Sequence, residues 1–163
     1  MDLDQDIAIL AEQERLLRFT RFDQAVAWEL GTRLKTTAEA RGVAIAIEIR
    51  LSRETVFFYA MPGTTPANAD WARRKRNTVE LLQRSSYAVG RSLAKEGRTL
   101  EQKMGLALRD YATHGGGFPI RVEGVGCVGA VIVSGLPERE DHKLVSAVVA
   151  ELCGKSIEGV QLD

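Results

Sequence analysis

Apolar residues recur at helical spacing in the segment after residue 23: Ala27, Leu30, Leu34 and Ala38. Just before them, the stretch TRFD (residues 20–23) has the spacing of a capping box. In such a box a hydroxyl accepts from a free backbone N–H and an acid follows three residues later. Gly42 is suited to end a helix, because glycine readily adopts the left-handed conformation. The pattern therefore predicts one helix between Thr20 and Gly42.

The hydrophobic period then changes to two, which is typical of a strand. In residues 43–51 the apolar set Val43, Ile45, Ile47, Ile49 and Leu51 alternates with small or polar side chains. After a polar break at residues 52–55, the stretch VFFYAMP (residues 56–62) predicts a second strand that ends at Pro62 and Gly63. We expect these two strands to form an antiparallel hairpin, followed by a loop over residues 63–70.

A helical period returns from Trp71 to Lys95. Gly90 and the serine pair at residues 85–86 permit a break, so one long helix and two short ones fit the pattern equally well. Thr99 is placed to cap a single short helical turn after this segment. The middle of the chain is therefore expected to be helical.

Two further strands follow a glycine-rich loop. Residues 118–122 alternate in period two, which predicts a strand with one wetter face, and Pro119 places that strand at an edge of the sheet because proline cannot donate to the ladder. Residues 125–135, VGCVGAVIVSG, are almost wholly apolar, as expected of a central strand covered on both faces. Gly124 and Gly126 bracket the turn between the two strands.

A last helix is expected to begin at Pro137 and to end at Gly154. Three acids in its first turn, Glu138, Glu140 and Asp141, complement the positive end of the helix dipole. The resulting order is helix, two strands, helical middle, two strands, helix. It predicts an α+β fold in a single domain, residues 1–163, with an antiparallel sheet of about four to five strands flanked by helices.

The composition argues against several classes of protein. Among 163 residues, 22 basic and 22 acidic side chains give a net charge of zero, so nucleic acid is not an expected partner. No apolar run approaches the roughly 18 residues that span a bilayer, and three aspartates stand where a secretory signal would be basic, so a cytosolic protein without membrane contact is expected. Cys127 and Cys153 lie in apolar segments without a metal or redox spacing, and we expect both to be reduced thiols in the core rather than a disulfide or ligands.

The stretch HGGG, residues 114–117, is the first candidate for a binding site. Gly115, Gly116 and Gly117 can expose backbone N–H groups to an anion or to a flat ligand edge. The alternative is a tight loop that lets the chain enter the next strand past a packed neighbour. His114 has a nitrogen lone pair that can ligate iron or move a proton, although a lone loop histidine is more often a hydrogen-bonding residue.

The run WARRKRN, residues 71–77, is the strongest charge feature. Arg73, Arg74 and Arg76 are candidates to pair with ligand carboxylates or phosphates, and a solvated helix face is the alternative. For His142 the alternatives are a functional role and a solvated, charged helix face. No nucleophile elbow, paired carboxylate motif or zinc spacing is present, so the residues do not decide whether the protein is an enzyme.

Residues 114–145, HGGGFPIRVEGVGCVGAVIVSGLPEREDHKLV, resemble the C-terminal half of the haem-degrading domain family. This family includes GlcG-like proteins and a domain appended to some corrinoid adenosyltransferases. Residues 61–90 resemble its small cytosolic subgroup. The resemblance implies a profilin-like layered sandwich, haem as a cofactor, and assembly into dimers or larger rings. The positions that match the family motifs are Gly115, Gly116, Gly117, Pro119, Gly129, Ser134, Gly135, Glu140 and Asp141. Of these, we expect the three loop glycines, Ser134, Glu140 and Asp141 to bind ligand. Iron ligands differ among the haem-linked members of the family, so the resemblance transfers none of them, and His114 is the local candidate.

Two hypotheses follow. In the first, the chain binds haem or another tetrapyrrole and supports its breakdown, with His114 on the iron and Arg73, Arg74 or Arg76 on the propionates. In the second, it is a non-catalytic oligomeric module that binds a small anionic ligand or a partner protein.

Overall fold

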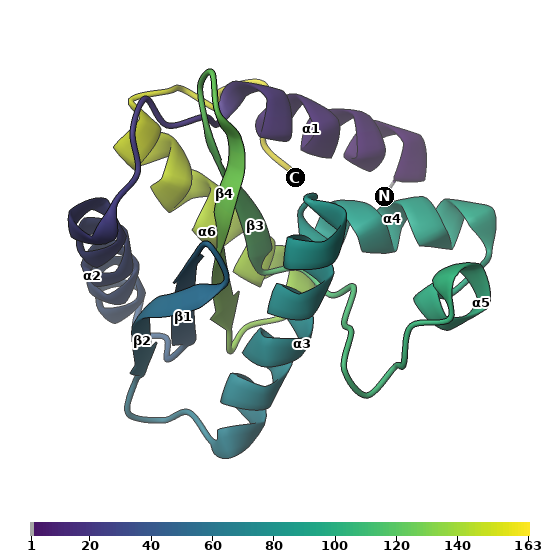
Figure 1. The fold of residues 1–163 in the computed structure, drawn as a ribbon, viewed down its shortest axis with the longest axis horizontal. Helices are drawn as coiled ribbons and strands as arrows, with labels where there is room; N and C mark the ends of the chain where they lie inside the picture. Colours follow the sequence, from purple (N-terminus) through teal and green to yellow (C-terminus); the bar gives the residue numbers. More distant parts are fainter. Residues whose placement is uncertain (1) are drawn as a thin grey trace.

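Six helices and four strands follow one another along residues 2–163, the part of the chain that this computed structural model describes (Figure 1). Their bounds are α1 Leu3–Leu16, α2 Gln24–Ala40, β1 Ala46–Leu51, β2 Glu54–Ala60, α3 Pro66–Leu82, α4 Ser86–Glu96, α5 Leu100–Met104, β3 Gly117–Val122, β4 Gly126–Ser134 and α6 Glu138–Cys153. No helix in this part of the chain is long and apolar enough to span a bilayer.

The four strands form one antiparallel sheet in the order β2-β1-β4-β3. The α+β fold class is therefore confirmed, as are both predicted hairpins. β4 is a central strand and β3 is an outer one, which is where the proline argument placed Pro119. The second half of β4, residues 130–134, is buried on both faces, as a central strand covered on both sides allows.

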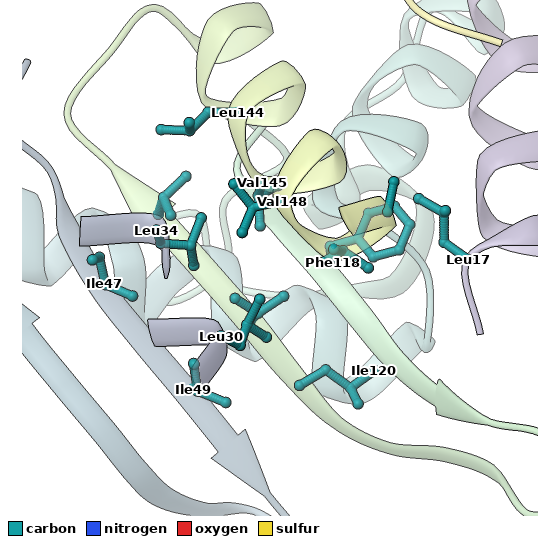
Figure 2. Close-up of a cluster of buried hydrophobic side chains, with 14 of the residues drawn as sticks. Leu17, Leu30, Leu34, Ile47, Ile49, Phe118, Ile120, Leu144, Val145 and Val148 are labelled. Atoms are coloured by element: carbon teal, nitrogen blue, oxygen red, sulfur yellow. The ribbon is translucent and has the colours of Figure 1, made fainter. Parts of the chain in front are cut away.

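Two helices cover one face of the sheet, and a third covers the other. α2 and α6 pack on the face that carries Ile47, Ile49 and Phe118, where the main hydrophobic core lies (Figure 2). α3 packs on the opposite face, where Ala72 and Ala130 are both fully buried and their small side chains leave room for the helix. α3 also covers β3, so the prediction that one face of this strand is more exposed to solvent is wrong.

Local capping explains the other differences from the expected elements. The N-cap of α2 is Asp23, whose carboxylate accepts from Val26 N at 2.9 Å, so the predicted box at Thr20 is wrong. The expected loop over residues 63–70 is also wrong beyond Thr65, because Thr65 caps α3 in a capping box with Asn68 and Pro66 occupies the first helical turn.

The helical middle divides into two helices, which the pattern had left open. α3 ends at Leu82, and Gln83 adopts a left-handed conformation with φ of 53°. Ser85 then caps α4 by accepting from Ala88 N. The single short turn expected after Thr99 is confirmed as α5, and Gly154 ends α6 as expected.

The N-terminal helix α1 was not predicted, and most of the residues it buries are polar: Asp6, Gln13 and Glu14 beside Leu10. Its Asp6 is buried and forms ion pairs with Arg139 of α6 at 2.9 Å and Arg91 of α4 at 2.9 Å. Gln13 donates to Val160 O at 2.7 Å. These contacts attach α1 to the C-terminal segment and to the helices beside the sheet.

Candidate functional site

Two neighbouring pockets share His114. The first, here the polar pocket, has a volume of about 230 Å³ and is lined by Asn68, Trp71, Lys75, His114, Ser134, Gly135, Leu136, Glu138 and Asp141. The second, here the apolar slot, has a volume of about 300 Å³ and lies among α4, α5 and the segment 106–114. His114 is exposed at the border of both, so one imidazole can serve either pocket.

The glycine loop approaches the backbone of the same chain. Gly116 has φ of 127°, and a Cβ there would lie 2.4 Å from Val133 O, closer than atoms can approach. Gly117 N donates to Ser86 Oγ at 3.0 Å, and Val133 N donates to Gly116 O at 2.9 Å. The tight-loop interpretation is thus what the geometry shows for these glycines. The loop holds His114 in place beside the two pockets.

A buried ion pair forms the floor of the polar pocket. Lys75 Nζ lies 2.9 Å from Asp141 Oδ2 and donates to Val133 O at 3.0 Å. Asp141 also accepts from Leu136 N at 3.0 Å and from Gly135 N at 3.3 Å. Burial raises the pKa of Asp141 and lowers the pKa of Lys75, while the attraction between them favours both charges. The pair therefore ties α3 to the start of α6 across the end of β4.

Aromatic and cationic groups line the border between the pockets. The Trp71 and His114 rings meet edge to face, with centroids 4.7 Å apart. The Arg74 guanidinium lies over the Trp71 ring at 4.3 Å and donates to Leu108 O at 2.7 Å. Because Arg74 also lines the apolar slot, it can present its charge to a ligand there.

The other predicted cations face different directions. Arg73 pairs with Asp110 at 3.0 Å and with Asp70 at 3.3 Å. Arg76 pairs with Glu48 at 3.2 Å over the sheet. The arginines at residues 73, 74 and 76 are therefore not brought together around one cavity. Glu140 lines neither of the two pockets that share His114. It is exposed and lines a separate hollow between α6 and the C-terminal segment.

His142 is fully buried, so the solvated-face interpretation is wrong for this residue. Its Nε2 lies 2.8 Å from Gln13 Oε1, and its ring stacks on Tyr87 with centroids 5.4 Å apart. Burial lowers the pKa of His142 to about 3, so the imidazole is neutral at physiological pH. It is enclosed by protein and lies in neither pocket.

Lys75 was not among the candidate site residues, although the sequence contains a signal for it. Ala72, Lys75 and Val79 recur at helical spacing, and all three are buried. The phase of the helix therefore separates Lys75 from the more exposed arginines beside it. The solvated-face interpretation of the whole run is wrong at this position.

No potential metal ligands cluster in the described residues: nowhere do three or more His, Cys, Asp or Glu side chains converge. Cys127 and Cys153 are free thiols, as expected, and both are only partly buried. His114 is the one histidine that lines either pocket among the described residues.

Residues 22–150 match the family described as "Haem degrading protein HbpS-like". The UPF0303 protein of Azotobacter vinelandii (strain DJ / ATCC BAA-1303) is 52% identical over 163 residues, which cover 100% of this chain and 98% of that protein. The crystal structure of the Ybr137w protein is similar with a TM-score of 0.80 and 27% identity, over 90% of this chain and 87% of that one. The crystal structure of the PduOC:Heme complex shares the fold with a TM-score of 0.64 and 18% identity, over 76% and 89% of the two chains.

Proposed function

Because the chain belongs to the HbpS-like haem-degrading protein family, we propose that it binds haem or a related tetrapyrrole in the apolar slot, with His114 as the iron ligand. The observation that carries the proposal is the position of His114, which is exposed and lines both the slot and the polar pocket. A neutral imidazole is a common axial ligand of haem iron. The haem complex of PduOC, a protein with the same fold, adds support.

The residues around the slot are of the kinds that hold such a group. A haem site combines an apolar wall, an axial ligand and cations for the propionates. Leu93, Leu106 and Leu108 line the slot and supply the wall, while Arg74 and Arg98 supply positive charge at its margin. The volume of about 300 Å³ is at the lower end for ligand pockets, so the slot takes in one edge of the macrocycle. Bound haem would supply the redox chemistry of its iron, and the chain would hold and orient it.

A haemin titration tests the proposal. We expect the purified chain to give a saturable shift of the Soret band, and His114→Ala to reduce or remove it. An unshifted band, or a band that His114→Ala leaves unchanged, would reject His114 as ligand. The family description also motivates a second stage, in which reductant and oxygen are added to the complex. Loss of the Soret band faster than for free haemin would support haem breakdown.

A small polar or anionic ligand in the polar pocket is the second candidate function. Ser134 is only 4% exposed yet lines this pocket, and α6 begins there with Pro137, which supplies no side-chain cap to the helix N–H groups. A thermal-shift screen of small carboxylates, repeated with Ser134→Ala, distinguishes this candidate. Stabilisation that Ser134→Ala removes, together with a flat haemin titration, would favour it over haem.

We further propose that the chain acts as a homo-oligomer, a dimer or larger ring, in the cytosol. The family resemblance motivates the assembly, and the resemblance of residues 61–90 to the cytosolic subgroup motivates the location. Sedimentation of the purified chain tests the assembly.

A further inference from the structure

The two outer strands of the sheet differ in how their free edges are covered. Beside β3, Phe19 bridges to Val122, and its N–H donates to Arg121 O at 2.8 Å. β2 has no strand on its outer side among the described residues, and it is the strand at the margin of the sheet beside α2 in Figure 1. Its stretch 56–59 contains neither a charge nor a proline, the usual protections of an open edge. This edge can therefore pair with another strand.

Aromatic side chains are uncovered on both faces of this edge. On the α2 face, Trp28 is 67% exposed and meets Phe57 edge to face, with centroids 5.7 Å apart. Phe58 is 47% exposed and is in register with Glu48, whose carboxylate faces Arg76 of α3, so it lies on the other face. A surface hollow of about 570 Å³ between α2 and β2 adjoins these rings. Exposed apolar groups grouped in this way mark interaction surfaces.

We propose that β2 pairs antiparallel with β2 of a second copy of this chain, about a two-fold axis near Phe57, to form a continuous eight-stranded sheet. An axis perpendicular to the sheet places α2 of both copies on the same face. Trp28 contacts Phe57 and therefore lies next to the axis, where the second copy covers it. On the other face of the sheet, Phe58 of each copy is the diagonal neighbour of its counterpart across the axis, a separation that aromatic side chains can reach.

The charges at the two ends of the edge favour a second copy as the occupant. Arg53 and Glu54, at the hairpin end, are exposed and form no ion pair within the described residues. Lys35 lies over the Tyr59 ring at 5.9 Å, near the other end of β2, and Glu39 is its ion-pair partner. Antiparallel pairing brings the hairpin end of one copy to the Tyr59 end of the other. Glu54 then meets Lys35, and Arg53 approaches Glu39, twice by symmetry. With a net charge of zero, two copies do not repel each other overall.

Sedimentation velocity over a range of protein concentrations tests this surface. We expect the wild-type chain to sediment at twice its mass of 17.9 kDa or at a larger multiple, and Phe58→Lys to reduce that mass by at least half. Phe58 is half exposed, so circular dichroism should show the variant folded. Val125→Lys is the matched control, because Val125 is an apolar residue 73% exposed at the distant turn between β3 and β4, and its mass should not change.

A charge-swap experiment tests the antiparallel geometry. Glu54→Lys and Lys35→Glu should each dissociate on their own, because every copy then meets like charge. An equimolar mixture of the two variants restores both attractive contacts and should recover the wild-type mass. A monomeric wild type, an undiminished mass in folded Phe58→Lys, or a mixture that stays dissociated would overturn the proposal.

This inference rests on the self-association proposed above and is independent of haem. A monomer that binds haemin would overturn the interface and leave the haem proposal standing. An assembly of the predicted mass that gives no Soret shift would do the reverse.

Discussion

Replacing Lys75 by Met should destabilise the fold because it leaves Asp141 buried without its counter-charge. The two side chains are only 4% and 1% exposed, so water cannot replace the lost partner. Removing one member of a buried ion pair costs about 3–5 kcal/mol. Asp141 keeps its two backbone N–H donors from Gly135 and Leu136, so we expect the lower end, about 3 kcal/mol. For a chain of this size that loss lowers Tm by about 6–12 °C.

The stability lost in Lys75→Met should increase as pH rises. Burial already raises the pKa of Asp141, and removing the Lys75 charge raises it further. The folded variant then binds a proton more readily than the unfolded chain, so its stability falls as pH rises above about 4, the ordinary value for Asp. The difference in unfolding free energy between wild type and Lys75→Met should therefore be smaller at pH 5 than at pH 7.5.

Urea unfolding at the two pH values, followed by circular dichroism, measures this difference. Lys143→Met is the control, since Lys143 is a more exposed lysine on α6 whose pairing distance to Glu140 is 3.7 Å, and it should change stability by less than about 0.5 kcal/mol. A loss below about 1 kcal/mol for Lys75→Met, or a loss that does not vary with pH, would refute the reasoning.

Three further predictions concern the loop, the buried histidine and α1. Gly116→Ala should lower the free energy of unfolding in urea by several kcal/mol, because its Cβ would lie 2.4 Å from Val133 O. Gly124→Ala is the control: a Cβ there has open space, so it should cost only about 1–2 kcal/mol of backbone strain. Equal losses for the two variants would contradict the packing argument. Because the pKa of His142 is lowered to about 3, only the unfolded chain gains this proton as pH falls below about 6.5. Protonation of His142 in the unfolded chain should then lower the wild-type free energy of unfolding by up to about 1.4 kcal/mol per pH unit. His142→Gln should show a shallower decline with falling pH. An equal pH dependence in the two proteins would argue against this role of His142. Asp6→Asn should lower the free energy of unfolding by about 2 kcal/mol and speed amide hydrogen exchange in α1. Asp4→Asn, at an exposed position, should do neither. If the amides of α1 stay protected from exchange in Asp6→Asn, contacts other than those of Asp6 hold the helix.

Periodicity was sufficient to predict the sheet and most helices, because their buried faces are continuous. The second half of β4 is a run of buried, mostly apolar residues, and α6 buries apolar residues at helical spacing, so the type of each element could be read from the sequence. Helix starts were less certain, since a cap depends on one local hydrogen bond. Thr20 and Asp23 both have suitable side chains, and the structure shows that Asp23 is the cap, accepting from Val26 N.

The site was predictable in part. The motif residues Ser134 and Asp141, which the sequence had marked as candidates, line the same pocket as His114. The apolar slot could not have been predicted, because its wall comes from short segments of α4, α5 and the following loop that have no joint periodicity. The burial of His142 depends on Gln13, which is 129 residues away in the chain, and on a helix that sequence analysis had missed.

The most direct test of the account is a haemin titration of wild type against Ala94→Trp. Ala94 is exposed at the slot, so an indole there fills the space without disturbing the core, and Val125→Trp is the matched control on the far turn. We expect the Soret shift to weaken at least about tenfold in affinity, roughly 1.4 kcal/mol, for Ala94→Trp and to persist for Val125→Trp. Equal haemin affinity in all three proteins would contradict the assignment of the apolar slot as the haem site.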